Sequence, residues 1–118
     1  GDHARAVTMY HRALDAGLRE PHRHRAILQL AAAYRDGGHL NRALELVDAV
    51  LATHPTSSAA AALRALVVHD AGDAAEAVAD LVDALLDHST DDDAATYRAA
   101  LHRAAADLRA RHEVRDDH

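Results

Sequence analysis

The stretch HRAILQLAAAYRDGGHLNRALELVDAVLATHP, residues 24–55, holds two helical patterns separated by a pair of glycines. The apolar residues of the first pattern recur at steps of three and four positions, at Ile27, Leu30, Ala31 and Tyr34. Gly37 and Gly38 interrupt it, and a second pattern carries Ala43 and Val47 before Pro55 ends it. A small residue lets two helices approach closely, and a bulky residue one turn later fills the gap. The stretch therefore predicts two packed helices joined by a tight turn.

The same spacing continues through the chain, whose 118 residues are a usual length for one domain. We expect an all-α fold of six antiparallel helices, over about residues 2–17, 21–36, 39–54, 58–71, 74–88 and 91–111. In the sixth helix the apolar residues at helical spacing are Ala94, Tyr97, Leu101, Ala104 and Leu108. Residues 1–112 form the predicted domain, and 113–118 form a predicted frayed tail.

Three segments share a pattern of glycine, four residues, alanine, and then apolar residues at helical steps. They are Gly1, Ala6, Val7, Tyr10, Ala13 and Leu14; Gly38, Ala43, Leu44, Val47, Val50 and Leu51; and Gly72, Ala77, Val78, Leu81, Ala84 and Leu85. The intervals between the glycines are 37 and 34 positions. A period of 34 indicates helical hairpins stacked side by side. The alternative is an alanine-rich bundle whose glycines fall 34 apart by chance.

These motifs, with Gln29-Leu30-Ala31 and Asn41-Arg42-Ala43-Leu44, resemble the tetratricopeptide repeat (TPR), and in particular a small bacterial group of TPR proteins. The resemblance covers nearly the whole chain and implies a right-handed TPR-like α-solenoid. It comprises a half-repeat, one good repeat, one degenerate repeat and a closing helix. The chain departs from the family pattern where Ile27 replaces the usual tryptophan, Val47 the usual phenylalanine, and Arg64 a buried leucine.

The composition argues against several classes of protein. A net charge of −6 argues against a nucleic-acid-binding protein, which usually has a basic face. Without cysteine there is no disulfide, thiol nucleophile or cysteine-bound metal, and without lysine there is no Schiff base. No apolar run approaches the roughly 18 residues that span a bilayer, and no signal peptide opens the chain. We expect a cytoplasmic protein with no membrane partner. Because the chain begins at Gly1 without methionine, we also expect an excised domain.

Motifs of catalysis are missing from the sequence, and we expect no enzyme activity. There is no G-x-S-x-G elbow, phosphate-binding glycine-rich loop or dinucleotide fingerprint. The eleven histidines raise the question of a metal site, since imidazole is a common ligand. His22 and His24 are two positions apart, which does not align them on one face of a helix. We therefore expect neither a metal nor another cofactor.

The histidines also affect the charge of the molecule. If all eleven were protonated, the net charge of −6 would change sign. Because the ordinary histidine pKa is about 6.5, we expect salt- and pH-dependent association below about pH 6. An isoelectric point far from the sequence value of 5.9 would contradict this expectation.

The resemblance implies a concave groove that accepts a peptide and is lined by the first helix of each pair. Carried onto this sequence, the lining residues are Arg25, Leu28, Gln29, Ala32, Arg35 and Asp36, followed by Ala59, Ala62, Leu63, Leu66, His69 and Asp70. The lysine and asparagine clamp of the family's best-known groove is not reproduced. Arg25 and Arg35 offer forked bonds to a carboxylate; the alternative is that they lie in water or pair with aspartates. We interpret Leu28 and Leu66 as partly buried packing residues.

These features predict a non-enzymatic module that binds a protein or peptide segment in the groove. A second hypothesis is self-assembly into a homodimer through Met9, Tyr10 and Leu14, because the initial half-repeat leaves one flank uncovered. A third is that the chain is an accessory domain of a larger regulatory or catalytic protein. Light scattering at several concentrations separates the first hypothesis from the second.

Overall fold

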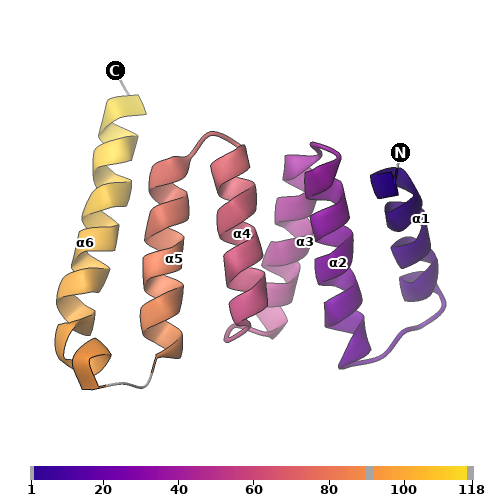
Figure 1. Ribbon diagram of the computed structural model, residues 1–118, viewed down its shortest axis with the longest axis horizontal. Coiled ribbons are helices and arrows are strands. Elements are labelled where there is room, and N and C mark those ends of the chain that lie inside the picture. Colours follow the sequence, from indigo (N-terminus) through magenta and orange to yellow (C-terminus); the bar gives the residue numbers. More distant parts are fainter. Residues whose placement is uncertain (1, 90–91, 117–118) are drawn as a thin grey trace.

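Helices form nearly all of the computed structural model, which describes residues 2–89 and 92–116 (Figure 1). They are α1 (Asp2–Asp15), α2 (His22–Asp36), α3 (Leu40–Thr53), α4 (Ser58–Asp70), α5 (Ala74–His88) and α6 (Asp92–Asp116). The described residues contain no strand, which confirms the predicted all-α class. The bounds of the first five helices lie within two residues of the predicted ones.

The sixth helix is longer than the sequence analysis predicts. α6 continues to Asp116, beyond the predicted end at residue 111 and into the predicted tail, 113–118. No glycine or proline between Asp92 and Asp116 stops the helix. Residues 117 and 118, and Gly1 with its place in the repeat pattern, lie outside the described part of the chain.

Two glycines at equivalent repeat positions shape the turns between helices. Gly38 and Gly72 have φ angles of +80° and +93°, in the left-handed region that favours glycine. The backbone conformation of the turn therefore explains why the repeat carries glycine at this position. One residue after Gly72, Asp73 caps α5 by accepting a hydrogen bond from the amide of Glu76 at 3.0 Å.

Successive helices pack against one another in chain order, so the molecule is a stack of helical hairpins. α2 also contacts α4, which joins the first helices of two consecutive pairs. Among the described residues, α6 contacts α5 and no other helix. Figure 1 shows the consequence: α4, α5 and α6 stand side by side in one row, whereas α3 lies behind α2. The stack measures 45 × 39 × 20 Å.

The best-packed part of the core joins α2, α3 and α4. Its buried members, each at most 2% exposed, are Ala31, Val47, Val50 and Ala60. Ala31 and Ala60 allow the helices to approach, and Val47 fills the space between them, as the small-then-bulky pattern predicts. Full burial of a valine side chain contributes about 1.5–3 kcal/mol relative to exposure. A second cluster between α4 and α5 holds only Ala65, Val68 and Ala77, with Leu44 against it.

Candidate interaction surface

The predicted groove residues lie along α2 and α4 and differ in exposure. The exposed ones are Arg25, Gln29, Asp36, Ala59, Ala62, Leu66, His69 and Asp70, whereas Ala32 and Arg35 are half-buried. Leu28 and Leu63 pack against the first core cluster. Leu66 is 47% exposed, so it is more open to solvent than a packing residue.

Arg35 and Asp70 connect the two helices of this predicted groove. Arg35 Nε donates a hydrogen bond to Asp70 Oδ2 at 2.5 Å. This bond lowers the pKa of Asp70. Of the two alternatives for Arg35, pairing with a neighbouring aspartate is therefore the one found. Arg25 is exposed, and no ion pair joins it to another residue in the described ranges.

Equivalent positions of the two repeats differ in burial on α3 and α5. Val47 on α3 is 0% exposed, whereas Leu81, 34 positions later on α5, is 47% exposed. Leu51 packs against the first core cluster, whereas its counterpart Leu85 is 74% exposed. α2 and α4 contact each other and cover the apolar positions of α3. α6 makes no such contact with α4, which leaves the matching positions of α5 open.

The closing helix presents a polar face to α5. Tyr97 and Leu101 belong to the predicted apolar stripe of the sixth helix, and they are 59% and 42% exposed. The side chain of Ala94 is outside the described part of the chain. Arg98 donates to the carbonyl oxygens of Leu86 and Ser89, both at 3.2 Å. α6 is thus held by hydrogen bonds, ion pairs and the small buried side chain of Ala105, while much of its apolar stripe is left exposed.

Arg109 is the centre of the contacts between α6 and α5. Its guanidinium donates to Glu76 Oε2 at 3.0 Å, Asp80 Oδ1 at 2.8 Å and Asp83 Oδ2 at 2.7 Å. Burial tends to raise the pKa of Asp83, but hydrogen bonds from His102 and Arg109 outweigh it and lower that pKa. Burial, together with the charge of Asp80, raises the pKa of Glu76. The carboxylates of α5 therefore explain why the polar face of α6 turns toward it.

Arg64 pairs with carboxylates of α5 that also pair with Arg109. These ion pairs explain why the chain has an arginine at a position where the repeat usually has leucine. Its side chain, 27% exposed, bonds to Asp48 of α3 at 3.0 Å and pairs with Asp80 of α5. The neighbouring positions Ala65 and Val68 are buried. The chain therefore accommodates Arg64 at the edge of the helix interface, next to carboxylates that neutralise it. A depression of about 370 Å³ lies here, but its charged groups are largely paired with one another.

On α5, two further depressions lie on either side of Leu85. The first, of about 300 Å³, is lined by Ser58, Ala62, Leu81, Ala84, Leu85 and His88. The second, of about 410 Å³, is lined by Leu85, Leu86, Ser89, Asp93, Tyr97, Ala100 and Leu101. We call the exposed apolar residues around them the α4–α6 apolar surface: Ala62, Leu66, Val78, Leu81, Leu85, Tyr97 and Leu101.

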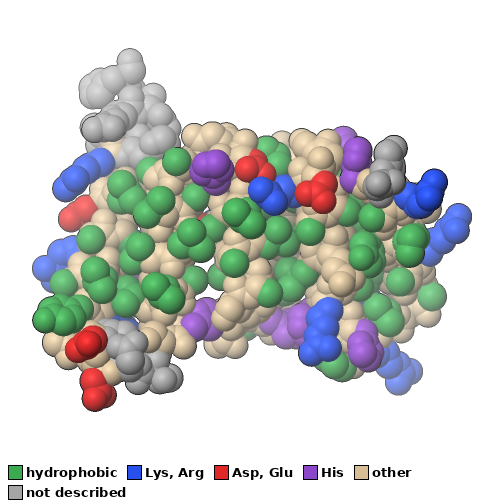
Figure 2. Space-filling model, in the orientation of Figure 1, with side chains coloured by type: hydrophobic (Ala, Val, Ile, Leu, Met, Phe, Trp, Pro, Cys, Tyr) green, Lys and Arg blue, Asp and Glu red, His purple; other side chains and the backbone are tan. Residues whose placement is uncertain are grey.

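Figure 2 shows one broad face of the molecule with hydrophobic side chains spread across it, over α4, α5 and α6 as well as over α1 and α2. Charged side chains lie mainly along the edges of this face. Large apolar areas on a protein surface often mark binding sites, so this group of exposed side chains is a candidate for one. Of these residues, only Ala62 and Leu66 belong to the predicted groove, and Leu66 is interpreted there as a packing residue; the others have the spacing of core positions.

A separate cluster contains the residue types of a metal site. Glu20, His24 and His54 offer ligand atoms that all lie within 4.8 Å of one another. The spacing of His22 and His24 does not reveal this group, because His54 is 30 positions from His24.

No helix in the described ranges is both long enough and apolar enough to cross a membrane.

Comparison with known proteins agrees with the architecture. A family model described as "Tetratrico peptide repeat" matches residues 1–108, which include α1 to α5 and most of α6. No curated protein and no solved structure matches the chain significantly. Repeat scaffolds of this family are generally non-enzymatic and bind other proteins. The match spans far more than half of the 118 residues, and the chain therefore belongs to the tetratricopeptide repeat family.

Proposed function

We propose that this protein is an interaction module that binds an amphipathic helix of another protein on the α4–α6 apolar surface. The observation that carries the proposal is the exposure of Leu81 and Leu85, at 47% and 74%, in positions whose counterparts on α3 are covered by a neighbouring helix. In the stack, a helix is what covers these positions. A partner helix would complete for α5 the packing that α2 and α4 provide for α3.

The chemistry of the lining favours a helical ligand over an extended one. The two depressions beside Leu85 are mostly apolar, and their side chains offer few hydrogen-bond groups. An extended peptide would lose water from its backbone amides without replacement bonds, which costs about 1–3 kcal/mol for each group. A helix satisfies its own backbone and presents apolar side chains at steps of three and four. Two such side chains would enter the depressions on either side of Leu85.

The charge of the molecule indicates which flanks the partner should have. The net charge is −6, and Asp93 lines the second depression. Complementary charge speeds association and disfavours wrong partners. We therefore propose that the bound helix has an apolar stripe flanked by arginine or lysine.

The test uses a displayed library of basic peptides whose apolar residues recur at steps of three and four positions. The control library has the same composition, but its apolar residues alternate with polar ones. The protein should select helical-period sequences and not alternating ones. Leu85→Asp should then weaken binding of selected peptides at least about tenfold, because Leu85 lines both depressions. Met9→Asp is the matched control, since Met9 is 62% exposed on α1, away from this surface. Equal losses in both variants, or equal selection from both libraries, contradict the proposal.

The α2–α4 residues are a proposed extension of the same surface, because Ala62 lines the first depression and Asp70 joins α4 to α2. Arg25 would contact an acidic group at the far end of the ligand, and Arg35 would do so by exchanging its bond to Asp70. Arg25→Ala combined with Arg35→Ala should weaken peptides that carry such a group and leave the others unchanged. If the double variant binds every selected peptide as tightly as the wild type does, Arg25 and Arg35 are not part of the binding surface.

Self-association is a second candidate because Met9 is 62% exposed on α1, a helix that contacts only α2 among the described elements. A homodimer through this flank should weaken on Met9→Asp and persist on Leu85→Asp. Light scattering that finds only monomers at high concentration excludes the homodimer and leaves the peptide-binding proposal intact.

A further inference from the structure

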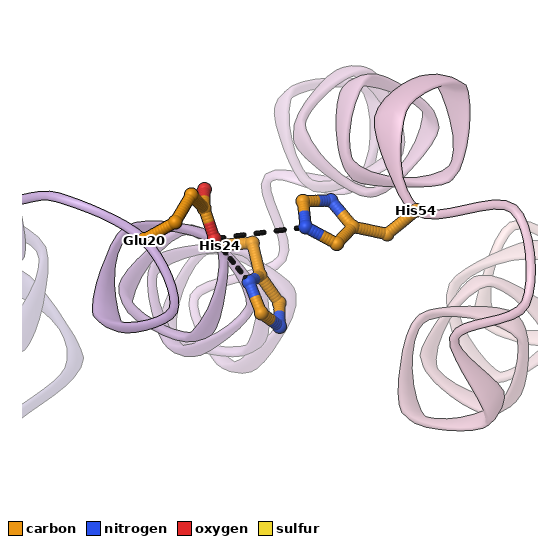
Figure 3. Close-up of side chains that lie close together, drawn as sticks. All are labelled: Glu20, His24 and His54. Atoms are coloured by element: carbon orange, nitrogen blue, oxygen red, sulfur yellow. Dashed lines mark hydrogen bonds and ion pairs between the residues drawn. The ribbon is translucent and has the colours of Figure 1, made fainter.

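We infer that Glu20, His24 and His54 form a binding site for a divalent transition-metal ion of the zinc class (Figure 3). Glu20 Oε2 lies 2.5 Å from His24 Nδ1 and 3.6 Å from His54 Nε2. Ligand atoms bound at about 2.0–2.1 Å in a tetrahedral site are roughly 3.3 Å apart. The two edges that meet at Glu20 are therefore within about 1 Å of tetrahedral spacing, and the two rings must turn to complete the arrangement.

The three residues come from separate parts of the stack that are held in fixed relation. Glu20 is in the turn before α2, His24 is in the first turn of α2, and His54 directly follows α3. α2 and α3 pack on each other through the first core cluster. An ion at this position would connect the two helices of one hairpin at their open end. It should therefore bind the folded chain and stabilise it.

Thr53 prepares His54 to act as a ligand. The Thr53 hydroxyl donates to the carbonyl oxygen of Val50 at 3.3 Å and lies 2.8 Å from His54 Nδ1. While the single hydroxyl hydrogen is donated to Val50, the hydroxyl oxygen can only accept from Nδ1–H. In neutral His54 this leaves a lone pair on Nε2, the nitrogen nearer Glu20. Fixing the tautomer through the second ring nitrogen is how proteins commonly orient a metal-binding histidine.

The rings of His24 and His54 are stacked, with centroids 4.1 Å apart and planes inclined by 29°. A nitrogen lone pair lies in the plane of its ring, so both rings must turn out of the stack to face one ion. Their side chains are 20% and 33% exposed, which leaves room to turn on the solvent side. With three protein ligands, a fourth position stays open to water.

The ligand set indicates which ion would bind. Two imidazoles and one carboxylate suit Zn²⁺ and its neighbours in the first transition series, whereas Mg²⁺ and Ca²⁺ prefer oxygen ligands alone. The inference concerns an end of the hairpin that is not part of the α4–α6 apolar surface. It stands or falls independently of the proposed function.

The test is a titration of the chelator-treated, full 118-residue chain with Zn²⁺, followed by competition with a chromophoric chelator and by thermal unfolding. We expect one ion per chain and a melting temperature that rises with Zn²⁺ and not with Mg²⁺. Co²⁺ should give the visible absorption of a four-coordinate site. Glu20→Gln and His54→Gln should each weaken Zn²⁺ binding at least about tenfold, and Thr53→Val should weaken it about tenfold by freeing the tautomer.

Two histidines outside the cluster serve as controls. His22→Gln removes an exposed histidine near the site, and His69→Gln removes one that is 66% exposed on α4. Both should bind Zn²⁺ as the wild type does, and circular dichroism should show that every variant is folded. Equal weakening in all variants would identify unspecific binding to surface histidines and overturn the inference. So would an absence of binding at millimolar Zn²⁺.

Discussion

At the scale of single residues, charged groups determine how the closing helix is attached. Arg109 and His102 reach carboxylates on α5, and Arg64 approaches the same carboxylates from α4. Such groups stabilise only while they are paired, because an unpaired charge that is partly removed from water is costly. The attachment of α6 should therefore depend on a few side chains.

Arg109→Met tests this dependence. The change removes a shared cation from the carboxylates of Glu76, Asp80 and Asp83. Asp80, only 15% exposed, keeps Arg64, and Asp83 keeps His102. Since hydrogen bonds between charged groups are worth about 1.5–3 kcal/mol, we expect a loss of about 2 kcal/mol in the free energy of unfolding. Chemical denaturation gives the value. Arg42→Met is the matched control, because the Arg42–Glu45 pair is exposed, and it should cost clearly less.

His88 should make stability depend on pH. Its Nδ1 lies 2.6 Å from the carbonyl oxygen of Ala84 and its Nε2 2.5 Å from that of Thr56. A carbonyl only accepts, so both bonds form only in doubly protonated His88, and these bonds, with the charge of Asp87, raise its pKa above 6.5. The stabilisation is fully present below the ordinary pKa and is lost as pH rises through the raised one.

The measurement for His88 compares the wild type with His88→Gln. The wild type should be more stable than the variant at about pH 5.5, and the difference should shrink by about pH 8.5. His69→Gln is the control, since neither nitrogen of that exposed side chain is bonded to a carbonyl oxygen in the described structure. A difference of the same size at both values of pH would show that His88 stabilises the fold without its charge.

At the scale of elements, the sequence predicts well where the helices lie. It predicts less well which apolar helix faces are covered by a neighbouring helix. The 34-residue period located Gly38 and Gly72, and both have the positive φ that the turn requires. Periodicity shows which side of a helix is apolar, but it does not show whether a neighbour covers that side. Val47 and Leu81 occupy the same repeat position, yet only Val47 is buried. The difference lies in α6, whose attachment depends on ion pairs that no local pattern reveals.

For the candidate sites too, the sequence indicates single residues but not which of them meet in the fold. Sequence analysis predicted groove residues on α2 and α4 by resemblance, including Arg35 and Asp70, but spacing alone left open whether these two pair. The spacing did not reveal His54 as a partner of Glu20, because two helices and the turn between them separate the two residues in the chain. Contacts between residues distant in sequence depend on the packing angles of helices, and these depend on the core as a whole.

Ala31→Leu tests how closely the helices of the first core cluster approach. Ala31 is 0% exposed beside Val47 and Ala60, so a larger side chain has no free space. Overpacking of this kind costs about 1–3 kcal/mol. Ala49→Leu on the exposed side of α3 is the control and should change stability by less than about 0.5 kcal/mol. Equal effects in denaturant titrations would mean that α2, α3 and α4 are not closely packed.

At the scale of the whole molecule, the stack is not uniform along its length. From α2 to α4 the helices share a buried apolar cluster, whereas α6 is attached to α5 through polar contacts and one small buried side chain, Ala105. The first part holds the two helices of the hairpin that carries Glu20, His24 and His54 against each other. The second part explains why apolar side chains remain exposed on α5 and α6. Binding is therefore expected at the less completely packed end of the stack.

The separation of α4 from α6 tests the central claim most directly. The chain has no cysteine, so Ala62→Cys and Ala100→Cys, both at exposed positions, allow two spin labels to be placed without side reactions. Packed helices lie about 8–10 Å apart, and helices on opposite sides of a third lie at roughly twice that distance. Electron paramagnetic resonance of the peptide-free chain should give a separation near the larger value. A separation near the smaller value would show that α6 closes onto α4 and covers the α4–α6 apolar surface, which would contradict the account.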